Sequence, residues 1–324
     1  MNEASMIGML STTVSFGALL YLACIGELIS EKAGVLNLGV EGMMALGAVT
    51  GFLVALNTEN PWLALLVAMI VTAAFASIHG IFTVVLGAEQ VVSGLSLTFL
   101  GLGLSAFFGK SAVGNPPGAV LSNVDWGPLS DIPWVGPILF QQSPMVYFAL
   151  LVGLLTSFLL TRTSIGLALR GAGESASTVD TAGHSVVKIR LAAVATGGAL
   201  AGAAGAYLTL SITTSWQDGA TAGRGWIAVA LVIFGAWKPG RAAIGALLFG
   251  GLLALKTRLQ TFGVDFSPIL LSMIPYLLTI GVLLIISIRA RHRPSASPAE
   301  IGKVYRREEL QQKRKAGNGL GTFY

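Results

Sequence analysis

The sequence contains one cysteine, Cys24, and three histidines among its 324 residues. A single cysteine forms neither a disulfide within the chain nor a multi-cysteine metal site, and it leaves the redox compartment unassigned. The histidines, His79, His184 and His292, lie on separate segments and form no metal-ligand pair. We therefore expect neither a disulfide framework nor a bound metal.

Charged residues are also scarce: they make up 11% of the chain, whereas a soluble globular domain carries roughly 25%. Hydrophobic residues make up 54%, and the mean hydropathy is +0.76. Most apolar stretches are close to the ~20 residues with which a helix crosses a bilayer core, and the alternating ~10-residue strands of a barrel are absent. The sequence therefore predicts an all-α polytopic membrane protein.

The apolar stretches predict about nine transmembrane helices, in a range of eight to ten that includes short or broken segments. The first has no basic n-region and carries Glu3, unlike a cleaved signal. With the N-terminus outside and the C-terminus inside, sixteen of the twenty Lys and Arg residues lie inside, in agreement with the positive-inside rule. Residues 1–290 then form the transmembrane domain and residues 291–324 a basic cytoplasmic tail. The predicted spans are residues 6–29, 36–56, 61–86, 91–108, 144–161, 191–210, 226–237, 242–260 and 268–288.

Two connections and the tail are long enough to have features of their own. The extracytoplasmic loop, residues 109–143, has a density of proline and glycine that forbids a continuous helix and suits an ordered cap at the membrane interface. The cytoplasmic loop, residues 162–190, is small, polar and compatible with helix, and a solvated connector is its alternative interpretation. Nine basic residues follow Ile288, which indicates a tail at a membrane surface rather than binding to nucleic acid. In the tail we expect a short amphipathic helix near residues 301–315.

Three apolar stretches are shorter than a span: residues 42–56 after Glu41, residues 225–237 after Arg224, and residues 242–255. Interrupted segments in matching positions indicate broken helices beside a substrate pathway in transporters. Small residues also repeat at four-residue spacing, which predicts close packing of helix backbones. These residues are Gly47, Gly51, Gly198, Gly202 and Ala206.

Glu41 is an acid inside an apolar segment, and two interpretations stay open. An intramembrane acid is costly and usually functional, which favours a pathway or gating residue; a broken helix leaves backbone donors that need a partner, which favours a structural acceptor. On a helix, Asn37 lies one turn from Glu41 on the same face. Arg224 is either the counterpart of Glu41 in the second interrupted segment or a residue at the outer interface. Trp226 either stacks on a ring of the cargo or anchors the end of a span. We expect these four residues to shape a translocation pathway.

Two stretches resemble nucleotide-binding motifs but do not meet their requirements. "FFGKS" has Leu104 where a phosphate-binding loop needs glycine. "GAGESA" has the glycine spacing of a dinucleotide fingerprint, but no strand precedes it and Arg190 stands in the position of the expected acid. We therefore expect no nucleotide and no other cofactor on this chain.

Three blocks of sequence, in this order, are typical of one family: "GELISEKAGVLNLGVEGMMALGA", "RTSIGLALRGAGESASTVDTAGHSVVKIRLAAVATGGALAGAAGAYL" and "GRGWIAVALVIFGAWKPGRAAIGALLFGGL". The chain resembles the permease subunits of ABC importers of the ribose and branched-chain amino acid permease superfamily. Within it, the first and third blocks are most similar to the nucleoside and simple-sugar branch. Sugar members tend to have Asp-Leu-Ser where this chain has Asn37, Leu38 and Gly39, which weakens a pentose assignment.

The resemblance implies a permease of the cell (inner or plasma) membrane that pairs with a homologous or identical permease. It also implies two cytosolic ABC ATPase subunits, which bind ATP and Mg, and an extracytoplasmic substrate-binding protein. A coupling helix is expected at about residues 171–183, where it fits a groove of the ATPase and transmits its closure. The basic residues Arg170, Lys188 and Arg190 are topology signals and candidate contacts with the ATPase. The coupling residues implied are Gly173, Glu174, Ser175 and Ala176, with Thr178 and Gly183 beside them.

The first hypothesis is thus a non-catalytic permease subunit of a binding-protein-dependent ABC importer for nucleosides or related small polar solutes, with simple sugars as the alternative cargo. The second is a secondary transporter in which Glu41 and His79 relay protons; otherwise His79 is a hydrogen-bonded interior residue. An intramembrane enzyme has little support, because the spans contain no recognisable paired catalytic acids or metal-binding histidines. The long polar loop at residues 162–190 favours the first hypothesis, since the other two do not require it.

Overall fold

A computed structural model describes residues 3–261 and 297–305 of the chain and, between these, residues 273–274, 277–281, 284 and 288. Within these residues the chain folds into helices and contains no strand. A π-helical turn extends the third helix to Val85, and another extends the eighth to Ile212. The α-helices are α1 Glu3–Lys32, α2 Val40–Thr58, α3 Pro61–Gly80, α4 Gln90–Gly109, α5 Pro144–Arg162, α6 Ser164–Glu174, α7 Ala176–Thr181, α8 Val186–Tyr207, α9 Arg224–Phe234 and α10 Pro239–Thr261.

Seven of the described helices are long and apolar enough to cross a membrane: α1, α2, α3, α4, α5, α8 and α10. This confirms the prediction of an all-α polytopic membrane protein, and each of the seven corresponds to a predicted span. The predicted span at residues 226–237 corresponds to α9, an apolar helix of only 11 residues. Of the last predicted span, residues 268–288, the structure describes only residues 273–274, 277–281, 284 and 288, and most of the tail lies outside the described residues. The orientation of the termini stays a prediction.

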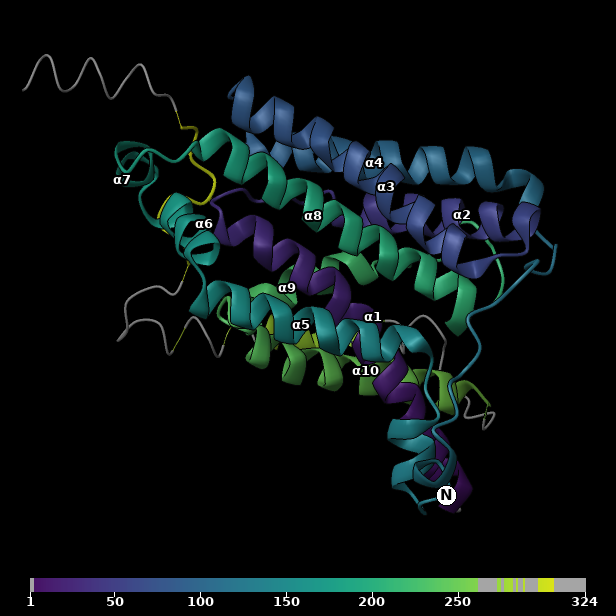
Figure 1. The fold of residues 1–324 in the computed structure, drawn as a ribbon. Helices are drawn as coiled ribbons and strands as arrows, with labels where there is room; N and C mark the ends of the chain where they lie inside the picture. The colour runs from purple at the N-terminus through teal and green to yellow at the C-terminus, as the bar shows by residue number, and fades with distance from the viewer. Residues whose placement is uncertain are drawn as a thin grey trace, which may run out of the picture.

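Helix α8 lies at the centre of the bundle and packs against α1, α2 and α3, while α6 and α7 lie together at one end (Figure 1). The small residues of α8 permit this central position. A β-carbon at Gly26 would lie 2.7 Å from the carbonyl oxygen of Gly197, and one at Gly47 would lie 2.5 Å from the Cα of Gly202. The backbones of α1 and α2 therefore touch that of α8 directly, which confirms the predicted close packing of the small-residue repeat.

Local sequence signals determine where several helices begin. The Asn60 side chain accepts hydrogen bonds from the backbone N–H groups of Trp62 and Leu63, both at 3.1 Å, and Pro61 occupies the first position of α3. Ser143 and Thr163 accept in the same way at the starts of α5 and α6. Such caps satisfy N–H groups that have no partner inside the helix, and proline at the first position loses no hydrogen bond.

Two of the three segments that the sequence predicts to be short are long in the structure. Helix α2 has 19 residues and includes Glu41 in its first turn, and α10 has 23 residues and includes Lys256. The prediction placed helix ends at charges, but a carboxylate is favourable in the first turn of a helix, where the N–H groups carry partial positive charge. The interruption before α2 lies at residues 33–39, and of the three segments predicted to be short only α9 is short in the structure.

The loop at residues 109–143, which the sequence places outside the membrane, contains only short helical turns, which confirms that its prolines and glycines prevent a continuous helix. Hydrogen bonds nevertheless fix it to the spans. The Leu121 N–H donates to the carbonyl of Leu210 at 2.9 Å, and the Gln142 amide donates to the hydroxyl of Ser11 at 2.8 Å. The loop is therefore tied to α1 and to the end of α8.

Candidate functional site

Glu41 fastens the N-terminus of α9 to α2. Its Oε1 accepts hydrogen bonds from the Thr221 hydroxyl at 2.6 Å and from the Gly223 N–H at 2.8 Å, and its Oε2 accepts one from the Gly225 N–H at 2.6 Å. The side chain is only 4% exposed. Because the first N–H groups of a helix lack intrahelical partners and carry partial positive charge, a buried carboxylate suits them as an acceptor. The donors belong to a segment far along the chain, and not to the glycines next to Glu41.

The two glycines before and after Arg224 make this contact possible. Gly223 has a φ of 78°, a conformation that glycine adopts without strain. At Gly225, a β-carbon would lie 2.5 Å from the Cα of Glu41. Only a chain without side chains at these points brings its N–H groups to the Glu41 carboxylate.

The four predicted pathway residues fall into two groups. Glu41, Arg224 and Trp226 come together where α9 begins: Arg224 lies between the two glycine N–H groups bound by Glu41, and its guanidinium donates to the carbonyls of Ala220 and Thr221 at 2.7 and 3.2 Å. Trp226 is half-buried on α9. Their part in a pathway stays a prediction.

The expectation that Asn37 shares a helix face with Glu41 is wrong. Asn37 precedes α2, and its side-chain oxygen accepts the N–H of Gly39 at 2.9 Å, which closes a turn just before the helix begins. Asparagine favours this local hydrogen bond over helix, so the helical spacing used in the prediction does not apply.

The loop between α1 and α2, residues 33–39, runs through the interior in a largely non-helical conformation. Non-helical backbone at membrane depth is tolerated only where other groups satisfy its N–H and carbonyl groups. Side chains from α1, α3, α4 and α8 do so here, at 2.7 to 3.1 Å. The pairs are Leu36 N–H with Gln90, Leu36 carbonyl with His79, Asn37 N–H with Glu27, Leu38 carbonyl with Thr98, and Ala33 carbonyl with Arg190.

Both ring nitrogens of His79 are engaged in this arrangement. Nε2 lies 3.1 Å from the carbonyl oxygen of Leu36, and Nδ1 lies 2.9 Å from the hydroxyl of Ser93. A carbonyl oxygen only accepts, so Nε2 carries the proton of the neutral ring and Nδ1 accepts from Ser93. His79 is thus a hydrogen-bonded interior residue that holds the α1–α2 loop.

We expect His79→Leu to lower the stability of the protein by about 1–3 kcal/mol, because the buried Leu36 carbonyl loses its donor. The unfolding temperature in detergent measures this effect. His184 offers a matched control, since it is exposed in the turn before α8 and its replacement by leucine leaves that carbonyl bonded. Equal stability of the two variants would contradict the assigned role of His79.

Two buried acids at the C-terminal end of α1, Glu27 and Glu31, were missed by the sequence analysis. Each is 1% exposed. Glu27 accepts the N–H of Asn37 at 2.8 Å, and Glu31 accepts the indole N–H of Trp237. The available signal was their four-residue spacing in "GELISEK", which places both on one helix face. These acids connect α1 to the loop after it and to the turn that follows α9.

The predicted coupling residues lie where α6 and α7 meet, at the end of the bundle (Figure 1). The expected single helix at residues 171–183 is wrong: α6 ends at Glu174, and Ser175 separates it from α7. The Ser175 hydroxyl lies 2.8 Å from that of Thr178, a local contact with which serine favours a helix boundary over a helix interior. Gly173 and Ala176 are buried, Glu174 and Thr178 are exposed, and Gly183, with a φ of 86°, follows the end of α7.

The C-terminal end of α6 lies directly against the α1–α2 loop. A β-carbon at Gly173 would collide with the carbonyl of Lys32, and one at Gly34 would lie 3.3 Å from the Cα of Gly173. Around Gly173 the nearest atoms all belong to the backbone of Lys32 and Gly34, so backbone meets backbone at this point. The end of α6 is therefore in direct contact with the start of the loop that leads into α2 and Glu41.

Arg190, at the start of α8, strengthens the same junction. The sequence predicts that it is a topology signal and a candidate ATPase contact, but it is 1% exposed. Its guanidinium donates to the carbonyls of Ala33 and Ala172, both at 3.1 Å, and to that of Lys303 at 3.3 Å. The fork of five N–H donors explains why an arginine is tolerated there, because it satisfies carbonyls from three separate segments at once.

Comparison with known proteins agrees with this architecture. The family described as "Branched-chain amino acid transport system / permease component" matches residues 9–283, most of the chain. The chain belongs to this permease family. The match confirms the resemblance stated from the three sequence blocks, and no solved structure matches the chain.

Three relatives of this permease have informative names. A Haloferax volcanii protein named as a candidate glucose ABC transporter permease is 41% identical, and the alignment covers 93% of this chain and 98% of the relative. A guanosine ABC transporter permease of Bacillus subtilis is 34% identical, and the alignment covers 84% of this chain and 89% of the relative. A nucleoside ABC transporter permease of Lactococcus lactis is 35% identical, and the alignment covers 82% of this chain and 87% of the relative. The permease is therefore a multi-pass membrane transport subunit.

Proposed function

We propose that this permease forms the translocation pathway of a binding-protein-dependent ABC importer for nucleosides and couples that pathway to a separate ATPase. The observation that carries the proposal is the backbone contact of Gly173, in the predicted coupling region, with Lys32 at the end of α1 and Gly34 in the α1–α2 loop. That loop continues into α2, whose Glu41 holds the short helix α9. Movement of the cytoplasmic region is thereby transmitted to α2 and α9, which we expect to line the path of the cargo.

The proposed assembly needs partners that supply energy and selectivity. Two cytosolic ABC ATPase subunits bind ATP and Mg, and their closure displaces α6 and α7 as a rigid unit. The contact residues are those predicted around the α6–α7 junction, of which Glu174 and Thr178 are exposed. A second permease, homologous or identical, completes the pathway, and an extracytoplasmic binding protein delivers the cargo.

Simple sugars are the second candidate cargo. The nucleoside proposal draws on the guanosine and nucleoside relatives, whereas the relative named for glucose, with 41% identity, favours sugars. Uptake of guanosine and glucose by the reconstituted complex, with calorimetry on its purified binding protein, decides between them. Saturable guanosine uptake that glucose does not inhibit supports the nucleoside assignment, and the reverse result contradicts it.

Reversing the charge of Glu174 tests the coupling role. We expect Glu174→Arg to lower ATP-driven uptake at least about tenfold while the folded transmembrane domain is retained, because Glu174 is exposed and its loss opens no cavity. Uptake in proteoliposomes and ATP hydrolysis are measured together. Glu59→Arg is the control: Glu59 is also exposed and lies at the opposite end of α2 from the α1–α2 loop.

Uptake by the permease alone would overturn the importer proposal. The secondary-transporter hypothesis expects that result, with a pH gradient as the driving force and loss of uptake on addition of an uncoupler. In proteoliposomes that contain the whole complex, the importer proposal expects uptake that requires ATP and persists when the pH gradient is collapsed.

A further inference from the structure

A segment of the C-terminal tail, residues 297–305, lies against the α6–α7 region instead of forming the expected helix. It consists of turns and irregular chain, so the predicted amphipathic helix is wrong for residues 301–305, and residues 306–315 lie outside the described part. The Glu300 N–H donates to the carbonyl of Gly173 at 2.8 Å, and the Ala299 N–H donates to Glu174 at 3.4 Å. The tail thus binds both residues at the end of α6.

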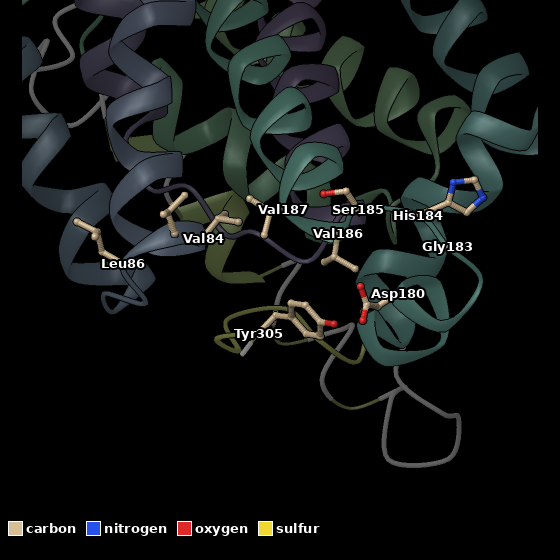
Figure 2. A pocket seen from close by; sticks show the side chains of 10 residues that line it. Val84, Leu86, Asp180, Gly183, His184, Ser185, Val186, Val187 and Tyr305 are labelled. Carbon is tan, nitrogen blue, oxygen red and sulfur yellow. The ribbon is translucent and has the colours of Figure 1, made fainter. Parts of the chain in front are cut away.

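The far end of this segment is held by Tyr305. Its side chain packs against a small apolar cluster of Ala172, Ala176, Val179 and Val186, which joins α6, α7 and α8. Figure 2 shows the hydroxyl of Tyr305 turned toward the helix that carries Asp180, and both residues line a cavity of about 590 Å³ between the tail, α7, the start of α8 and the end of α3. Tyr305 therefore adds a contact from the tail to this cluster.

Arg190 connects the tail to α6 and to the α1–α2 loop. Its guanidinium donates to the Lys303 carbonyl at 3.3 Å and lies 6.0 Å from the centre of the Tyr305 ring, over its face. The same group donates to the carbonyls of Ala33 and Ala172. One buried cation thus contacts the tail, the end of α6 and the α1–α2 loop, and its attraction to an aromatic face is strongest in such a desolvated place.

We propose that residues 297–305 form a strap that makes the tail part of the coupling unit, which we define as α6, α7 and the strap. The strap holds the α6–α7 junction against Arg190, so that a push on the exposed face of α6 moves the α1–α2 loop instead of bending the junction. The link to transport rests on the proposed function, whereas the mechanical role of the strap does not.

The test compares four variants of the full-length chain, each in nanodiscs. Tyr305→Ala removes the ring from Arg190 and from the apolar cluster, and Tyr305→Phe keeps the ring as a matched control. Deletion of residues 297–324 removes the strap, and deletion of residues 306–324 leaves it in place. The readouts are amide hydrogen exchange in α6 and α7, the unfolding temperature, and, in the complex with ATPase and binding protein, uptake per ATP hydrolysed.

We expect Tyr305→Ala and the longer deletion to speed exchange in α6 and α7 about tenfold, since an aromatic contact and a cation–π contact are lost. Exchange in α2, α3 and the membrane part of α8 and the unfolding temperature should stay unchanged, and uptake per ATP should fall at least about threefold. The shorter deletion should match the wild type, and Tyr305→Phe, which keeps the ring, should exchange more slowly than Tyr305→Ala.

Unchanged exchange in both Tyr305→Ala and the longer deletion overturns the strap. Faster exchange spread evenly over the bundle also overturns it, because a general loss of packing would then explain the result. Absence of ATP-dependent uptake in the wild-type complex counts against the proposed function alone, since the exchange measurement on the permease chain still decides whether the strap exists.

Discussion

Glu41→Ala should prevent most of the protein from assembling. The substitution removes the acceptor of three hydrogen bonds at once, and it leaves the buried Thr221 hydroxyl and Gly225 N–H and the partly buried Gly223 N–H without that acceptor. Each unsatisfied buried donor costs about 1–3 kcal/mol. We therefore expect α9 to separate from α2, and the yield of monodisperse protein on size-exclusion chromatography in detergent to fall severalfold.

Glu41→Gln separates the structural role of Glu41 from a role in the pathway. Glutamine keeps one acceptor oxygen but presents an amide donor toward N–H groups, so partial loss of assembly is expected if the carboxylate is structural. Normal assembly with altered uptake would support the pathway interpretation and contradict the structural one. Glu59→Gln provides the matched control, because Glu59 is an exposed glutamate next to the other end of α2.

Gly47→Val should have the second large effect. A β-carbon at Gly47 would lie 2.5 Å from the Cα of Gly202, so the new side chain meets the backbone of α8, which no rotation of a side chain relieves. Helices α2 and α8 must then move apart, and over-packing of this kind costs about 3 kcal/mol. The unfolding temperature in detergent should fall accordingly.

Gly103→Val is the control for this effect. Gly103 lies in α4, another membrane-spanning helix, and a β-carbon there meets nothing within 4 Å. The change in helix propensity is the same in both variants, so the difference between them measures the contact of α2 with α8. If the two variants unfold at the same temperature, the close approach of the two backbones does not stabilise the fold.

The spans were predictable from the sequence because lipid requires runs of apolar residues with satisfied backbone, and such runs are visible in one dimension. The lengths of α2 and α10 were not predictable in this way. The prediction took a charged residue as the end of a helix. In the structure the charged residues of α2 and α10 lie inside the helices, where hydrogen bonds and neighbouring groups stabilise them. Asn37 was misplaced for a related reason, since its local hydrogen bond to Gly39 overrides helical spacing.

The partners of buried polar side chains were beyond the reach of sequence patterns. Glu41 binds N–H groups up to 184 residues away, and Arg190 binds a carbonyl 157 residues before it. Arginine is almost never fully buried unless paired, so an exposed role was the reasonable expectation for Arg190. Nothing in the local sequence indicates that backbone carbonyls, which every residue carries, are the groups that pair with it.

The α1–α2 loop has a consequence for the order in which the protein is made. The ribosome completes residues 33–39 before it has synthesised His79, Gln90 and Thr98, and long before Arg190, although these residues satisfy the backbone of the loop. Residues 221–225, which bind Glu41, are likewise synthesised long after it. The first two spans therefore enter the membrane with polar groups that find their final partners late, and a ribosome stalled before His79 is synthesised should leave this loop accessible to water-borne labelling reagents.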